Sequence, residues 1–220
     1  MQTRSLSICT ALLKRQLCSS SQFIKAEDRR SAQVTLLELS QKFEAAGVSE
    51  PSLSAQLLVG EVLGITNLDL LPKVIEHSHL TANDMKRLET MTNCRLARMP
   101  MQYILGYWEF RQIKLKMRPP VFIPRPETEE LVGYVLDHLN LLNNIDVIQL
   151  LEIGCGSGAI SLSLMREHDS SSNALNILAV DQSNCACRLT VENATQLELL
   201  FPDAGDSVKE KYTTGIKQIF

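Results

Sequence analysis

Two carboxylates border a glycine-rich segment in the second half of the chain, and this combination can bind a nucleotide-like ligand. The glycines are Gly154, Gly156 and Gly158. They follow the mostly apolar stretch 150–153, and the apolar side chains of residues 159–165 recur at helical spacing, so we predict a strand, a tight turn and a helix start. Glycines suit such a turn because they adopt positive φ and let a ligand approach the backbone amides.

The two carboxylates are Glu152, just before the turn, and Asp181, which follows a second predicted strand over 176–180. An acid about 20 residues past the glycines can accept hydrogen bonds from a ribose diol. The glycines also satisfy a relaxed dinucleotide pattern, so a nicotinamide cofactor remains an alternative, as does a turn without a ligand. The negative charge of Glu152 attracts a cation such as the ammonium group of S-adenosylmethionine and repels a pyrophosphate. Glu152 therefore favours S-adenosylmethionine over a dinucleotide.

Three helices are expected in the first hundred residues. The first runs from Ala32 to Ala46 after the cap Ser31, the second starts at Glu50-Pro51-Ser52 and ends at Gly64, and the third runs from the capping-box residue Thr81 to about Met99. Their expected inward side chains include Val34, Leu37, Phe43, Leu53, Leu57, Leu58 and Val62. We therefore predict a helical domain over 31–107. His77 and His79 are interpreted as loop residues, and no metal site is expected.

A change of pattern follows the helical domain. Apolar and charged side chains alternate over 108–121, which predicts a β-hairpin linker between domains. A second domain is expected over 122–220, and it opens with a proline-rich loop that leads into a helix over 131–142. Arg125 in this loop has two interpretations: it pairs on the surface with Glu127 or Glu129, or it lines the cofactor pocket.

The charge distribution of the 220-residue chain limits its partners and location. The net charge is −3, yet residues 1–30 contain six Lys or Arg and two Asp or Glu, which gives +4 there and −7 elsewhere. This acidic remainder argues against a nucleic-acid-binding face. The leader lacks an acid before Glu27, so we predict a mitochondrial transit peptide, with a secretory signal as the alternative. No apolar run is long enough for a membrane span.

The six cysteines show no zinc-ligand spacing. Cys185 and Cys187 form the closest pair, but no second pair stands at ligand distance from them in the sequence. We expect free thiols that are buried or partly buried, since a reducing compartment disfavours disulfides.

Three stretches together resemble the HemK-type release-factor glutamine methyltransferases. They are Met-Pro-Met-Gln-Tyr-Ile-Leu-Gly at 99–106, Phe-Ile-Pro-Arg-Pro-Glu-Thr-Glu at 122–129 and Glu-Ile-Gly-Cys-Gly-Ser-Gly-Ala-Ile at 152–160. The resemblance implies a helical substrate-recognition domain and a Rossmann-like α/β methyltransferase domain. It also implies methylation of the Gly-Gly-Gln glutamine of peptide chain release factors. Together with the basic leader, it indicates a mitochondrial member of the family that works in the matrix. The implied S-adenosylmethionine-binding residues are Glu152, Gly154, Cys155, Gly156, Ser157, Gly158, Asp181 and Arg125.

The sequence departs from the family pattern toward its end. The family's Asn-Pro-Pro-Tyr segment does not occur, so no catalytic residue is assigned. Two strands of a seven-stranded sheet are predicted, and the tail after about residue 200 resembles no family segment. We therefore expect an incomplete, marginally stable cofactor domain of a shortened chain, with a catalytically inactive form that binds release factor or cofactor as the alternative function.

Overall fold

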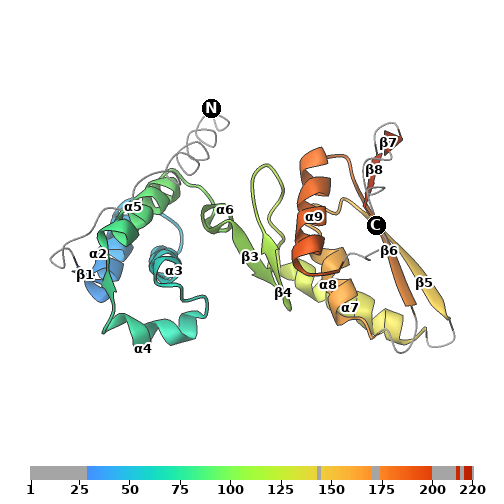
Figure 1. Ribbon diagram of the computed structural model, residues 1–220, viewed down its shortest axis with the longest axis horizontal. Coiled ribbons are helices and arrows are strands. Elements are labelled where there is room, and N and C mark those ends of the chain that lie inside the picture. The colour runs from blue at the N-terminus through green and yellow to red at the C-terminus, as the bar shows by residue number, and fades with distance from the viewer. Residues whose placement is uncertain (1–28, 143–144, 170–173, 200–211, 214–215, 220) are drawn as a thin grey trace. The chain divides into compact units, whose positions relative to one another are not determined.

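A computed structural model describes residues 29–142, 145–169 and 174–199, with the short segments 212–213 and 216–219 (Figure 1). The chain forms two compact units, which meet in the sequence between Leu105 and Gly106. The predicted transit peptide lies almost entirely outside the described residues. None of the described helices is long and apolar enough to cross a membrane.

The first unit is a small helical domain. Its helices are α2 (Ala32–Ala45), α3 (Pro51–Leu63), the 3-10 turn η1 (Leu68–Leu70), α4 (Leu71–Ile75), α5 (Ala82–Leu96) and α6 (Met101–Leu105). Two short strands, β1 (Arg30–Ser31) and β2 (His79–Leu80), pair in antiparallel fashion. The core contains fully buried side chains from α2, α3 and β2, namely Ala32, Phe43, Ala55, Leu58, Val59 and Leu80. The three predicted helices are therefore present as α2, α3 and α5.

The predicted helix boundaries are largely confirmed. Ser31 caps α2, and its hydroxyl accepts a hydrogen bond from the Val34 amide at 3.5 Å. Gly64 ends α3 in the left-handed conformation at φ 71°. Helix α5 ends at Leu96, earlier than the predicted Met99, because Arg98 adopts a φ of 66° that a right-handed helix excludes.

The predicted inward face of α2 is confirmed at Phe43, which is fully buried, and wrong at Val34 and Leu37. Val34 and Leu37 are 49% and 56% exposed, whereas the buried positions are Ala32, Thr35, Leu39 and Phe43. Leu53 of α3 is also exposed. The other inward residues predicted for α3 are confirmed, since Leu58 and Val62 are buried and Leu57 packs against the core. Apolar residues occur on more than one side of both helices, so apolar type alone misplaced single residues.

The capping box of α5 offers a direct stability test. The Thr81 hydroxyl accepts from the Asp84 amide at 3.2 Å, and the Asp84 carboxylate accepts from the Thr81 amide at 2.9 Å. We expect Thr81→Ala to lower the free energy of unfolding by about 1 kcal/mol, measured by urea denaturation. Thr90→Ala is the control, because its exposed hydroxyl lies inside the same helix and caps nothing. An equal loss in both variants would contradict a capping role.

The second unit begins with the predicted hairpin, formed by β3 (Tyr107–Phe110) and β4 (Ile113–Lys116). Phe110, Ile113 and Leu115 are buried. Arg111 at the hairpin turn makes two bonds to the Glu167 carboxylate, at 2.7 and 2.6 Å. These contacts make the hairpin part of the second unit rather than a free linker.

The remaining elements of this unit form a mixed α/β arrangement. They are α7 (Pro126–Asn140), β5 (Val147–Ile153), α8 (Ala159–Glu167), β6 (Ala174–Asp181), α9 (Asn184–Gln196), β7 (Tyr212–Thr213) and β8 (Ile216–Ile219). Helix α7 starts at Pro126, five residues before the predicted start, since proline fits the first helical position. The predicted strand, turn and helix around the glycines are present as β5, the turn and α8.

The sheet contains more than the two predicted strands. Its order is β5-β6-β8-β7, with β5 and β6 parallel and in register from Val147↔Ala174 to Ile153↔Val180 (Figure 1). Strand β8 lies antiparallel to β6, with Ala179 opposite Ile219. The sequence had given no role to the segment after residue 200, because a four-residue strand carries almost no periodic signal. In the structure, β8 pairs with the β6 edge that two strands alone would have left open.

Candidate cofactor site

The glycine turn between β5 and α8 is held in an unusual backbone conformation. Gly154, Gly156 and Gly158 all have positive φ, at 87°, 58° and 84°. The Gly154 and Cys155 amides both donate to the Val180 carbonyl, at 2.7 and 3.1 Å, which ties the turn to the end of β6. The carboxyl ends of the two parallel strands therefore meet at this turn, where α/β sheets bind their ligands.

The three glycines are required for two different reasons. A Cβ atom added at Gly154 or Gly156 would meet no heavy atom within 4 Å, so these positions need glycine for φ alone and border open space. A Cβ atom at Gly158 would lie 2.8 Å from side-chain atoms of Leu162 and Thr190. Gly158 therefore also permits the close packing of α8 and α9.

Glu152 lies in β5 with its carboxylate beneath the start of α8. It is 8% exposed, and both the amide of Ser161, at 3.1 Å, and the Ser161 hydroxyl donate to its Oε2 atom. Among the described residues, no donor reaches Oε1. Burial raises the pKa of Glu152 above its ordinary 4.5, the Ser161 bonds partly offset this, and the charge of Asp181 adds to the rise. A cation near Oε1 would stabilise the ionised carboxylate.

Asp181 lies where β6 ends and contacts the turn directly. Its Oδ2 accepts from the Gly156 amide at 3.0 Å, and its Oδ1 accepts from the Ser183 amide at 2.8 Å. Each carboxylate oxygen can accept a second hydrogen bond, so Asp181 can orient the turn and still accept from ligand hydroxyls. The structure thus brings together the two acids that the sequence singled out.

Cys155 and Ser157 contribute mainly backbone to the turn. The Cys155 side chain is buried, and burial raises the pKa of its thiol to about 12. The thiol therefore stays protonated near neutral pH and is no nucleophile. The Ser157 hydroxyl is buried and has no hydrogen-bond partner in the described part of the chain. Their predicted cofactor contacts remain predictions, and the burial of both side chains favours backbone contacts.

Comparison with known proteins identifies the relatives of this chain. Residues 35–106 match the model of the PrmC N-terminal domain family. The chain is 42% identical over 161 residues to the human MTRF1L release factor glutamine methyltransferase, covering 71% of this chain and 46% of the relative. This chain is a relative of the release factor glutamine methyltransferases. The family resemblance stated from the sequence is thereby confirmed.

Bacterial members of the same family give similar matches. The release factor glutamine methyltransferase of Vibrio cholerae is 34% identical, over 76% of this chain and 55% of the relative. That of Lactococcus lactis is 37% identical, over 60% of this chain and 48% of the relative. The chain spans about half the length of these curated relatives.

Arg125 makes no contact with the glycine turn among the described residues. It is exposed at the N-cap of α7, without a side-chain capping bond. Within the described residues it makes no ion pair with Glu127 or Glu129 either. Its predicted role in cofactor binding remains a prediction.

His77 lies in a turn, as expected, whereas His79 was expected in a loop and instead begins the short strand β2. No group of three or more His, Cys, Asp and Glu side chains in the described part of the chain is arranged to hold a metal. The described cysteines are free thiols, with Cys94, Cys155 and Cys187 buried and Cys185 exposed. Cys185 differs from the expectation because it lies on the exposed side of the first turn of α9.

Ser161 is a site residue that the sequence analysis did not single out. It was grouped with the apolar helix 159–165, although it supplies two donors to Glu152. The available signal was its spacing, because a serine at the third position of α8 places its hydroxyl near the end of the preceding strand.

Proposed function

We propose that this chain binds S-adenosylmethionine at the turn after β5, in a Rossmann-like domain. We further propose that it acts as an N5-glutamine methyltransferase on the Gly-Gly-Gln glutamine of mitochondrial peptide chain release factors. The observation that carries the proposal is the buried Glu152, whose Oε1 has no donor among the described residues, beside a glycine turn that Asp181 orients.

The two carboxylates at the turn, Glu152 and Asp181, fit S-adenosylmethionine better than a dinucleotide. An ammonium group near Glu152 Oε1 would compensate a buried charge, whereas a pyrophosphate would be repelled by it. Asp181 suits a ribose diol, and the open space beside Gly154 and Gly156 leaves room for close approach to the backbone. A nicotinamide dinucleotide is therefore the weaker candidate.

When bound, S-adenosylmethionine supplies an electrophilic methyl group on its sulfonium. The glutamine amide nitrogen is a poor nucleophile because its lone pair is delocalised, so the enzyme must orient it tightly. The residues described here bind and orient the donor, and we assign none of them to catalysis. We propose that the helical unit recognises the release factor and, from the basic leader, that the protein works in the mitochondrial matrix.

The methyl-transfer proposal is tested with the full chain, S-adenosylmethionine and a Gly-Gly-Gln fragment of a release factor, using peptide mass spectrometry. We expect methylation at the glutamine, and its loss in the double variant Glu152→Ala, Asp181→Ala. Fragment that stays unmethylated while the cofactor binds would exclude catalysis by this chain.

The described site also supports a second candidate function, because its residues can hold a ligand and none of them is assigned to catalysis. It is a binding form that holds a release factor or the cofactor without methyl transfer. A titration of the full chain with intact release factor distinguishes the two, because the binding form would retain affinity in the absence of product.

The affinity for S-adenosylhomocysteine should depend on pH through Glu152. Because burial raises its pKa above 4.5, the carboxylate becomes protonated as the pH falls through that raised pKa and loses its attraction for an ammonium group. We therefore expect the affinity to increase with pH above 4.5, measured by calorimetry at several pH values. A Glu152→Gln variant should give a flatter profile, and equal slopes in both proteins would contradict the assignment.

A further inference from the structure

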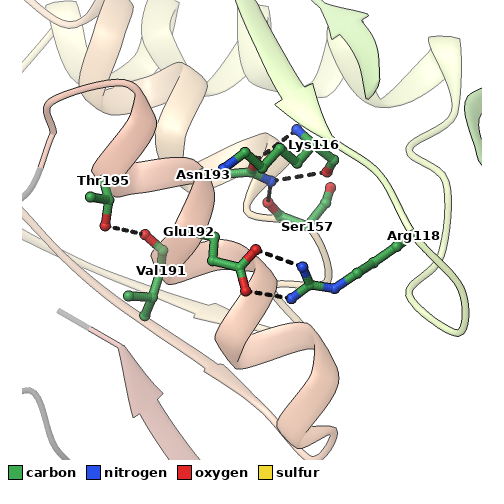
Figure 2. A network of polar contacts seen from close by, with 7 residues as sticks. All are labelled: Lys116, Arg118, Ser157, Val191, Glu192, Asn193 and Thr195. Carbon is green, nitrogen blue, oxygen red and sulfur yellow. Dashed lines mark hydrogen bonds and ion pairs between the residues drawn. The ribbon is translucent and has the colours of Figure 1, made fainter. Parts of the chain in front are cut away.

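Asn193 lies on α9 and is distant in sequence from the glycine turn, yet its side chain contacts that turn. The side chain is fully buried. Its Nδ2 atom donates to the Ser157 carbonyl at 2.9 Å and to the Lys116 carbonyl at 3.2 Å (Figure 2). Its Oδ1 atom accepts from the Lys116 amide at 2.7 Å. Both N–H donors of the amide are therefore used.

The two segments that Asn193 joins differ in backbone flexibility. Ser157 stands between Gly156 and Gly158, in a turn whose glycines have more backbone freedom than any other residue type. Lys116 is the last residue of β4, in a hairpin that packs on the same unit. One buried amide thus connects the most adaptable part of the site to a paired strand.

A neighbouring ion pair also joins α9 to the chain just after β4, at the surface. The Arg118 guanidinium donates two bonds to the Glu192 carboxylate, both at 2.6 Å (Figure 2). Both side chains are partly exposed, so solvent weakens this pair. The buried amide is therefore the stronger connection between the hairpin end and α9, and it alone of the two reaches the turn.

We propose that Asn193 is a positioning residue, which holds the glycine turn in its ligand-binding conformation through the Ser157 carbonyl. Strand β4 supports the same turn through Lys116. Without the amide, the carbonyls of Ser157 and Lys116 would each lose a donor. Ser157 is buried, so the turn would relax to satisfy its carbonyl. The effect on ligand affinity rests on the proposed function, whereas the effect on the turn itself does not.

The test uses Asn193→Asp in the full chain, which keeps the side-chain size and the acceptor for Lys116 but replaces the donor by an oxygen facing two carbonyl oxygens. We expect faster hydrogen–deuterium exchange in a peptide covering 154–160, while a peptide within α7 is unchanged. We also expect the calorimetric affinity for S-adenosylhomocysteine to weaken by about tenfold. Asn193→Ala, which adds no charge, carries the same expectations should the aspartate variant fail to fold.

Gln196→Ala is the matched control. Gln196 lies on the same helix and also donates from a side-chain amide to the hairpin, to the Lys114 carbonyl at 3.3 Å, but it is exposed and makes no bond to the turn. In the Gln196→Ala protein, we expect hydrogen–deuterium exchange in the peptide covering 154–160 to match that of the unmodified protein.

The outcomes separate the inference from the proposed function. Unchanged exchange at 154–160 in both Asn193 variants would overturn the inference, as would exchange that rises equally throughout the second unit, since that indicates a general loss of stability. Faster exchange confined to 154–160, with no ligand binding by the unmodified protein, would support the positioning role and reject the proposed cofactor.

Discussion

Replacing Glu152 by glutamine should weaken S-adenosylhomocysteine binding by roughly 10- to 150-fold and, at pH 7, increase the free energy of unfolding of the ligand-free protein. The first effect follows because glutamine lacks the charge that attracts the ammonium group. The second follows because the raised pKa of Glu152 shows that the fold without ligand favours the neutral carboxyl.

The sign of the stability effect is set by proton binding. Between pH 4.5 and the raised folded-state pKa, the native state binds more protons at Glu152 than the unfolded state does, so stability falls as the pH rises through this window. Above the window the ionised carboxylate opposes folding, and glutamine removes that cost. The amide of glutamine can still accept from Ser161 through its oxygen.

Urea denaturation and calorimetry on the same preparations measure the two effects. Glu192→Gln is the control, because it removes an exposed ion-pair carboxylate and should lower stability by at most about 1 kcal/mol, with little change in affinity. A Glu152→Gln protein that loses both stability and affinity would show that the charge holds the fold together, which contradicts its assignment to the ligand.

Alanine at Gly158 should lower the free energy of unfolding of the second unit by roughly 2–4 kcal/mol, since left-handed strain and overpacking add together. The φ of 84° disfavours any Cβ, and the added atom would lie 2.8 Å from side-chain atoms of Leu162 and Thr190. Gly154→Ala is the matched control, because it has a similar φ and open space around it, and should cost roughly 1–2 kcal/mol.

Urea denaturation of the single variants and of a Gly158→Ala, Thr190→Ser double variant checks this account. Serine removes the Thr190 methyl group that the new Cβ would meet, so part of the loss should be recovered when the two changes are combined. Equal losses at Gly154 and Gly158, without recovery in the double variant, would show that φ strain alone explains the glycine requirement.

The parts of the site that the sequence could predict are those with a local signal. The turn glycines and Asp181 stand at fixed distances from two apolar strands, so pattern alone indicated that they meet. Glu152 was identified because an anion just before the turn repels a pyrophosphate and suits a cationic ligand. The structure places the Glu152 and Asp181 carboxylates at the turn, as expected.

The parts that the sequence could not predict depend on contacts between distant segments. Asn193 reaches the turn from 36 residues away and the hairpin from 77, and nothing near it in the chain marks it as buried. Phe43 of α2 was placed correctly, but Val34 and Leu37 were placed wrongly because they are as apolar as Leu39, which does pack inward. Strand β8 escaped notice because its stability comes from pairing with β6, not from its own four residues.

The most direct test of the central claim is a calorimetric titration of the full chain with S-adenosylhomocysteine, alongside the Glu152→Ala, Asp181→Ala double variant and a parallel titration with NADH. We predict saturable binding of S-adenosylhomocysteine that the double variant loses, with no binding of NADH. Binding of NADH alone, or an affinity for S-adenosylhomocysteine that the double variant retains, would contradict the assignment of the turn between β5 and α8 as the methyl-donor site.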